Sequence, residues 1–136
     1  MVNLISIARK NIIFCKDDDT IDIIAKIMVD HNIGSVLVKN VNSDEYIGLI
    51  DDRMLFRLLT IGENPIPKKA KDVMKPLNII DGNYDIEKAW EKMQIVEDER
   101  FCVVDENERV VGIVKRQTIG YLRLKYLKQQ LGIVDL

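Results

Sequence analysis

Residues 20–28 read TIDIIAKIM and residues 85–93 read DIEKAWEKM, so the apolar positions of two stretches that lie 65 residues apart coincide. In each stretch the large apolar side chains recur at the spacing of one helix face. Each stretch also begins with Thr20 or Asp85, residue types that favour a helix N-cap. The sequence therefore predicts two amphipathic helices in equivalent positions of a duplicated unit.

The segments that follow the two helices repeat as well. In each copy, two apolar runs with a polar turn between them predict a β-hairpin: VLV at 36–38 with YIGLI at 46–50, and FCV at 101–103 with VVGIV at 110–114. A short strand is predicted at 12–15, and helices are predicted at 54–59 and 118–131 after the hairpins. We therefore predict an α+β fold of two β-α-β-β-α repeats, residues 1–66 and 67–136, packed through their sheets with pseudo-twofold symmetry.

Composition and charge argue against several classes of protein. The chain has 136 residues, of which 20 are basic and 22 acidic, so no strong overall field favours nucleic acid as a partner. It has no apolar run of the roughly 20 residues needed to span a bilayer, and no export signal, so we expect a cytoplasmic protein without a membrane contact. Cys15 and Cys102 lie in apolar runs and are predicted to be buried free thiols, with a disulfide as the alternative.

No motif typical of catalysis or of a metal site occurs in the chain, so we predict that it is not an enzyme and has no metal site. The acidic residues 17–19 could attract a divalent cation, but their place before a helix is explained by capping and by the helix dipole. His31, the only histidine, is expected at the surface near a helix end. The basic segment from Lys68 to Lys75 is interpreted as a solvated linker, with phosphate binding as the alternative.

The order of these elements in both copies resembles the cystathionine-β-synthase-type (CBS) domain family, as the tandem pair called a Bateman module. The resemblance is carried by Met28 and Met93 in the two helices, the runs at 32–35 and 72–74, and the Gly-hydrophobic-hydrophobic runs at Gly48 and Gly112. It implies a regulatory module that requires no cofactor and binds AMP, ADP, ATP or an S-adenosylmethionine-like ligand in a cleft between the copies. It also implies a homodimer that controls a separate effector protein.

Both copies depart from the nucleotide motif of that family, Gly-hydrophobic-hydrophobic-Ser/Thr-x-x-Asp. The hydroxyl position carries Asp51 in the first copy and Lys115 in the second, and the aspartate position carries Met54 and Thr118. A charged hydrogen bond to a ribose hydroxyl contributes about 1.5–3 kcal/mol, so its loss weakens binding roughly ten- to a hundredfold. Lys115 and Arg116 can still attract a phosphate, and Thr118 can accept one weaker bond.

The resemblance therefore assigns the ligand to the cleft of the second copy, with Ile113, Lys115, Arg116, Thr118, Lys75 and Leu77 as its binding residues. A weaker second cleft is assigned to Ile12, Leu49, Asp51 and Met54. The alternative is a ligand-free dimerisation or scaffold module with degenerate nucleotide pockets. The terminal helix carries apolar residues on more than one face, so it covers its own half, forms a homodimer seam or docks another protein. Trp90 lies on the core stripe of its helix and is expected to pack there.

Overall fold

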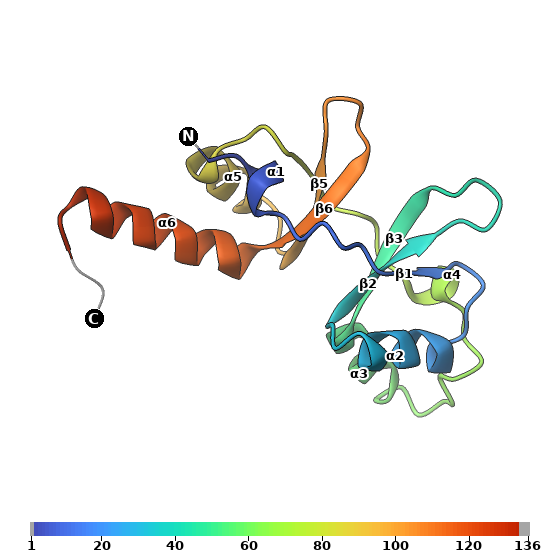
Figure 1. The fold of residues 1–136 in the computed structure, drawn as a ribbon. Coiled ribbons are helices and arrows are strands. Elements are labelled where there is room, and N and C mark those ends of the chain that lie inside the picture. Colours follow the sequence, from blue (N-terminus) through green and yellow to red (C-terminus); the bar gives the residue numbers. More distant parts are fainter. Residues whose placement is uncertain (1, 134–136) are drawn as a thin grey trace. The chain divides into compact units, whose positions relative to one another are not determined.

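The structure is a computed structural model that describes residues 2–133 (Figure 1). Its elements are, in order, α1 (Leu4–Ile7), β1 (Phe14–Lys16), α2 (Ile21–Asp30), β2 (Ser35–Lys39), β3 (Tyr46–Asp51), α3 (Asp52–Leu58), α4 (Ala70–Val73), β4 (Ile79–Asp81), α5 (Ile86–Met93), β5 (Arg100–Val104), β6 (Val110–Lys115) and α6 (Arg116–Gln130). The fold is α+β, as predicted, and the β-α-β-β-α order occurs in both copies. Residues 1 and 134–136, which the predicted halves include, lie outside the described part.

The two copies share the same sheet topology. Each has three strands, in the order β1-β2-β3 or β4-β5-β6, in which the first pair is parallel and the second antiparallel. The register of each hairpin shifts at the same point, between Val38 and Lys39 in the first copy and between Val103 and Val104 in the second. The duplication predicted from the apolar pattern thus extends to the details of strand pairing.

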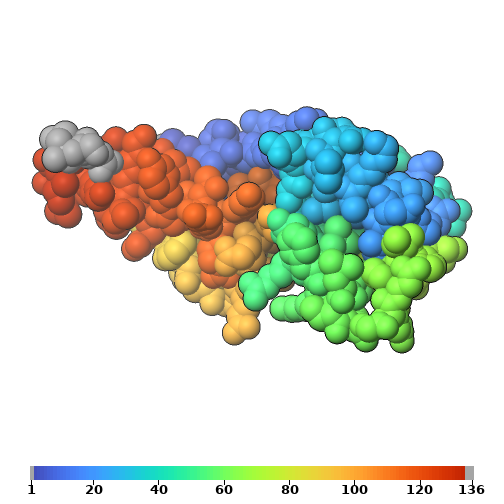
Figure 2. All heavy atoms as spheres, turned by 90° about the horizontal axis from the view of Figure 1, so that it is seen from below, coloured from blue at the N-terminus to red at the C-terminus, as the bar shows by residue number. Residues whose placement is uncertain are grey.

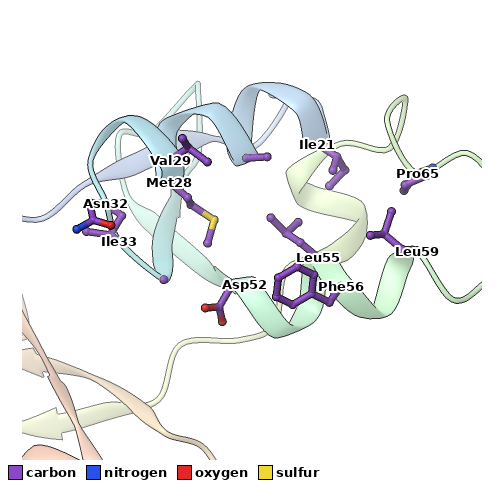
Figure 3. Close-up of a pocket in the computed structure, with 12 residues that line it drawn as sticks. Ile21, Met28, Val29, Asn32, Ile33, Asp52, Leu55, Phe56, Leu59 and Pro65 are labelled. Carbon is purple, nitrogen blue, oxygen red and sulfur yellow. The ribbon is translucent and has the colours of Figure 1, made fainter.

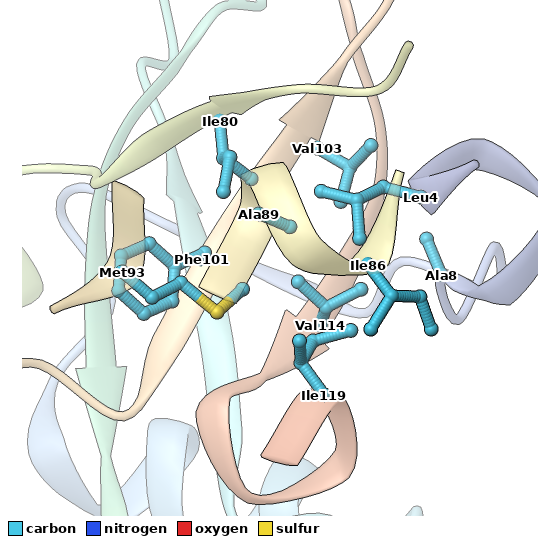
Figure 4. Packing of buried hydrophobic residues seen from close by; sticks show 10 residues of the cluster. All are labelled: Leu4, Ala8, Ile80, Ile86, Ala89, Met93, Phe101, Val103, Val114 and Ile119. Atoms are coloured by element: carbon cyan, nitrogen blue, oxygen red, sulfur yellow. The ribbon is translucent and has the colours of Figure 1, made fainter. Parts of the chain in front are cut away.

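Each sheet buries one face against its own helices. In the first copy, Ile24 and Met28 of α2 pack with Val36, Val38 and Ile50, since alternate residues of a strand point to the same side. In the second copy, the equivalent cluster combines one face of α5 with β4, β5, β6, the start of α6 and the N-terminal segment (Figure 4): Leu4, Ala8, Ile80, Ile86, Ala89, Met93, Phe101, Val103, Val114 and Ile119. Trp90 packs against this second cluster, as predicted.

The chain forms two compact packing units, and two short helices that the sequence analysis did not predict, α1 and α4, lie in the segments that set the boundaries of these units. Residues up to Asn11 pack with those from Asn78 onward, while Ile12–Leu77 form the other compact unit. The packing units therefore differ from the halves 1–66 and 67–136. The reason is that the segment before the first strand of each copy packs on the last strand of the other copy.

In both copies the segment that precedes the first strand pairs with the last strand of the other copy through two backbone hydrogen bonds. Arg9 exchanges two backbone hydrogen bonds of 2.9 and 3.0 Å with Ile113 of β6, and Lys75 exchanges two of 2.9 and 3.0 Å with Leu49 of β3. Gly112 is required at the first contact, because a Cβ there would lie 2.7 Å from the Cβ of Ala8 and 2.9 Å from the carbonyl oxygen of Arg9. The glycine of the repeated Gly-hydrophobic-hydrophobic run therefore has a packing role.

The helix boundaries agree with the sequence in part. Asp85 caps α5 as predicted, since its side chain accepts a 2.9 Å hydrogen bond from the Lys88 N–H. Thr20 precedes α2, but its hydroxyl donates to the Asp22 carboxylate and makes no cap bond. The predicted helices at 54–59 and 118–131 begin two residues earlier, at Asp52 and Arg116. Within residues 2–133, no helix has both the length and the apolar character to cross a membrane.

Candidate functional site

The junction between β6 and α6 in the second copy presents hydrogen-bond donors and positive charge. Lys115 is exposed at the end of β6, and α6 begins at the next residue with no side-chain cap bond from Lys115 and no acidic residue in its first turn. The first backbone N–H groups of a helix have no partner within the helix, and the helix dipole places partial positive charge there. This junction is therefore suited to an anion.

Two further cations that the sequence analysis missed lie in the same unit. Arg100, at the start of β5, is the direct antiparallel partner of Lys115, so their side chains share one face of the sheet. Arg9 is bonded to Ile113, two residues before Lys115 on the same strand. Partial burial, and then the charge of Arg100, lower the pKa of Arg9, which indicates that the two guanidinium groups lie close enough to repel. Pairing the predicted hairpin could have found Arg100, but no signal in the sequence pointed to Arg9.

Arg116, which was predicted to bind the ligand, has a different set of partners. Its guanidinium donates to the carbonyl oxygens of Val96 and Asp98, the latter at 2.8 and 3.2 Å. Its own N–H donates to the Glu99 carbonyl oxygen at 2.8 Å. Arg116 thus holds the loop before β5 against the start of α6. Of the other predicted residues in this unit, Thr118 is exposed and Ile113 is buried.

The equivalent junction of the first copy has the opposite charge pattern. Asp51 is only 8% exposed, and its carboxylate caps α3 by accepting a 2.9 Å hydrogen bond from the Met54 N–H. The other carboxylate oxygen lies 3.2 Å from Nζ of Lys75. The residue opposite Asp51 in the hairpin is Ser35, where the second copy has Arg100. The two junctions therefore differ by several charges at equivalent positions.

The structure distributes the predicted site residues over the two units. Lys75 and Leu77, which were assigned to the cleft of the second copy, belong to the Ile12–Leu77 unit, where Lys75 meets Asp51. The residues of the weaker cleft also lie in that unit, with Leu49 buried and Ile12 and Met54 half-buried. The structure thus brings Lys75, Leu49, Asp51 and Met54 together. Separately, it pairs Lys115 with Arg100 and places Arg9 beside Ile113, two residues before Lys115 on the same strand.

The remaining polar candidates have structural partners. Asp19 accepts a 2.8 Å hydrogen bond from the Lys16 N–H, and Asp17 accepts one of 3.3 Å from the Val41 N–H, so both brace loops. His31 is exposed at the C-terminal end of α2, as predicted. Lys68 lies 3.8 Å from Glu63 in the linker. Within the part of the chain that the structure describes, no group of three or more His, Cys, Asp or Glu side chains is placed to hold a metal ion.

The two cysteines are buried free thiols, as predicted. Burial raises the pKa of Cys102 to about 11. Burial, followed by the nearby charge of Asp19, raises the pKa of Cys15 to about 12. Because the thiolate is the reactive form, neither cysteine is suited to act as a nucleophile near neutral pH.

An apolar groove of about 630 Å³ lies between α2 and α3 (Figure 3). Most of the side chains that line it are apolar, and several of them are unusually exposed: Val29 is 77% exposed, and Phe56 and Leu59 are each 67% exposed. A second groove, of about 500 Å³, is lined by residues of α5, α6 and the N-terminal segment. Exposed apolar side chains gathered in one place commonly mark an interaction surface.

Helix α6 is longer than its counterpart in the first copy. It has 15 residues against seven in α3, and it extends past α5 in Figure 1. Along this extension the side chains are largely at the surface, which is visible in the orange-to-red atoms of Figure 2. Leu124 and Leu131 are 53% and 75% exposed. The prediction that this helix carries apolar residues beyond those needed to cover its own half is confirmed.

Comparison with known proteins agrees with this fold. An uncharacterised protein of Methanopyrus kandleri, MK0525, is 32% identical over 120 residues, which cover 87% of this chain and 61% of that protein's length. The crystal structure of a conserved CBS domain protein, TA0289 of Thermoplasma acidophilum, is similar with a TM-score of 0.76 and 24% identity, over 92% of this chain and 76% of that one.

A second solved structure is the CBS domain protein PAE2072 of Pyrobaculum aerophilum, in complex with AMP. It has a TM-score of 0.80 and 14% identity, over 93% of this chain and 97% of that one. The family model of the CBS domain matches this chain twice, at residues 4–61 and 70–119. The chain therefore belongs to the CBS domain family, as a tandem pair of CBS domains.

Proposed function

We propose that this protein is a regulatory module that binds an adenine nucleotide through its phosphates at the β6–α6 junction of the second copy. The observation that carries the proposal is the placement of Arg9, Arg100 and Lys115 on one face of the sheet beside the start of α6, which has no side-chain cap bond from Lys115. Cations that repel one another are stabilised when an anion binds between them. The AMP bound to PAE2072 supports the choice of ligand class, since that protein has the same fold.

The charge of the junction also discriminates between the ligands that the family resemblance suggests. AMP, ADP and ATP carry phosphates, whereas S-adenosylmethionine carries a cationic sulfonium and no phosphate. The three cations favour the nucleotides by Coulomb attraction and disfavour a sulfonium placed among them. Because Thr118 replaces the family's aspartate, its hydroxyl supplies the contact to the ribose, and the phosphates contribute most of the binding free energy.

Binding at this junction regulates a separate protein if the bound and free states differ in conformation or assembly. A ligand shifts such an equilibrium only by its difference in affinity for the two states. Helix α6 starts at the proposed phosphate site, carries the exposed Leu124 along its extension and ends at the exposed C-cap residue Leu131. One element therefore connects the ligand to a surface that an effector protein can contact.

Titration calorimetry with AMP and with ATP tests the proposal. Lys115→Glu reverses the charge at the centre of the site and is expected to lower affinity by at least tenfold, taking about 1.4 kcal/mol per decade. Lys125→Glu is the matched control, because Lys125 is exposed on α6 nearly three turns beyond Lys115 and its substitution changes the net charge by the same amount. Thr118→Ala should lower affinity severalfold through the lost ribose contact.

The proposal predicts a clear order of results. The wild-type protein and Lys125→Glu should bind ATP equally, Lys115→Glu should bind it poorly, and S-adenosylmethionine should give no heat. Equal affinities for the Lys115→Glu and Lys125→Glu variants would refute the assignment of the site. No binding of either nucleotide to the wild-type protein would favour the alternative, a scaffold module with degenerate pockets.

We propose further that the protein forms a homodimer through the groove between α2 and α3. The support is the exposure of Val29, Phe56 and Leu59 in one apolar concave surface. Phe56→Glu should convert the dimer to a monomer in sedimentation analysis, because it places a charge at the centre of the buried contact. Ile95→Glu, at a residue that is 78% exposed and lies outside the groove, should leave the dimer intact.

A further inference from the structure

At the β3–α3 junction of the first copy, Lys75 and Asp51 form an ion pair. The equivalent position in the second copy, at the β6–α6 junction, is the proposed ligand site. Asp51 follows Gly48, Leu49 and Ile50 as Lys115 follows Gly112, Ile113 and Val114, so Asp51 and Lys115 are equivalent residues. Lys75 and Arg9 are equivalent too, since each bonds through its backbone to the fourth residue of the last strand of a copy, Leu49 or Ile113. In the first copy Lys75 pairs with the carboxylate of Asp51. In the second copy Arg9 lies near another cation, Arg100.

Both residues of the Lys75–Asp51 ion pair are fixed in place by further hydrogen bonds. Lys75 is held by its two backbone hydrogen bonds to Leu49, and its Nζ lies 3.2 Å from Oδ2 of Asp51. Asp51 is held by its capping bond to Met54 and by burial, with only 12% of its side chain exposed against 29% for Lys75. An anion entering here would have to displace the carboxylate of Asp51, which cannot move without uncapping α3.

We propose that Asp51 is the residue that closes the first copy to anions, so that each chain binds one anionic ligand and not two. The carboxylate of Asp51 takes the place of the ligand's phosphate on the ammonium group of Lys75. This inference rests on the proposed function in naming the ligand of the second copy. It adds that, among the charges by which the two junctions differ, the carboxylate of Asp51 is the one that excludes an anion from the first copy.

The test uses Asp51→Asn, which removes the charge but retains an oxygen that can accept the capping bond from Met54. Asp52→Asn is the matched control, because Asp52 is the next residue, is exposed and loses the same charge. Calorimetry with ATP should give one site per chain in the wild-type protein and in Asp52→Asn. In Asp51→Asn we expect a second site, and in Asp51→Lys a second site with affinity within about tenfold of the first.

The same substitutions in a Lys115→Glu background separate this inference from the proposed function. There the site of the second copy is removed, so any ATP bound by Lys115→Glu/Asp51→Asn must occupy the first copy. A gain of one site over Lys115→Glu alone supports the inference, even if the wild-type protein binds no nucleotide. The inference is overturned if the wild-type protein binds two ATP molecules, or if neither substitution of Asp51 gains a site over its parent.

Discussion

Substitution of Leu4 by alanine should destabilise the second copy, although Leu4 lies more than 70 residues before the strand that starts that copy. Leu4 is 0% exposed and belongs to the same apolar cluster as Ile86, Met93 and Ile119. A buried leucine replaced by alanine costs about 2–5 kcal/mol, from lost transfer free energy and the cavity left behind. With a urea dependence of about 2 kcal/mol per molar, a loss of about 3 kcal/mol lowers the midpoint by roughly 1.5 M.

Urea unfolding followed by tryptophan fluorescence is the assay. Trp90 is the only tryptophan, and it packs against the cluster that contains Leu4, so its signal reports on the unit that the substitution affects. Lys10→Ala is the control, because Lys10 is exposed in the same N-terminal segment and should change stability by less than about 0.5 kcal/mol. If Leu4→Ala unfolds at the same urea concentration as Lys10→Ala, the N-terminal segment does not belong to the core of the second copy.

Two further predictions concern the helix caps and the thiols. Asp85→Ala should lower the free energy of unfolding by about 1 kcal/mol because it removes a cap bond, whereas Thr20→Ala should cost clearly less because Thr20 makes none; equal losses in urea unfolding would contradict this. Burial raises the pKa of Cys15 to about 12 and that of Cys102 to about 11, from an ordinary value of 9.0. The folded state therefore retains these protons where the unfolded state loses them, so their contribution to stability is complete below about pH 9 and is lost as pH rises toward 11 and 12. The free energy of unfolding should fall more steeply over this window in the wild-type protein than in Cys15→Ala/Cys102→Ala, and parallel curves would contradict the assignment.

The pattern of apolar residues was enough to predict the repeats and most of their elements. The stripes that contain Ile24 and Ile86 are local properties of the chain, since a helix or strand buries one face whatever it packs against. The short helices α1 and α4 were missed because four residues carry too little periodicity to show a face. The exchange of segments between the copies was missed for a related reason, because no local pattern says on which sheet a short connecting segment will pack.

For the candidate site, too, some features could be predicted from the sequence and others required the structure. The sequence by itself determined that Lys115 and Asp51 occupy equivalent positions with opposite charges, because alignment of the two copies needs no coordinates. Only the tertiary structure decided which groups meet them: Arg9 and Arg100 in the second copy, and Lys75 in the first. The physical reason is that electrostatic interactions depend on distances of a few ångströms between side chains. The hydrogen bonds of Arg9 to Ile113 and of Lys75 to Leu49, between residues far apart in the chain, set those distances.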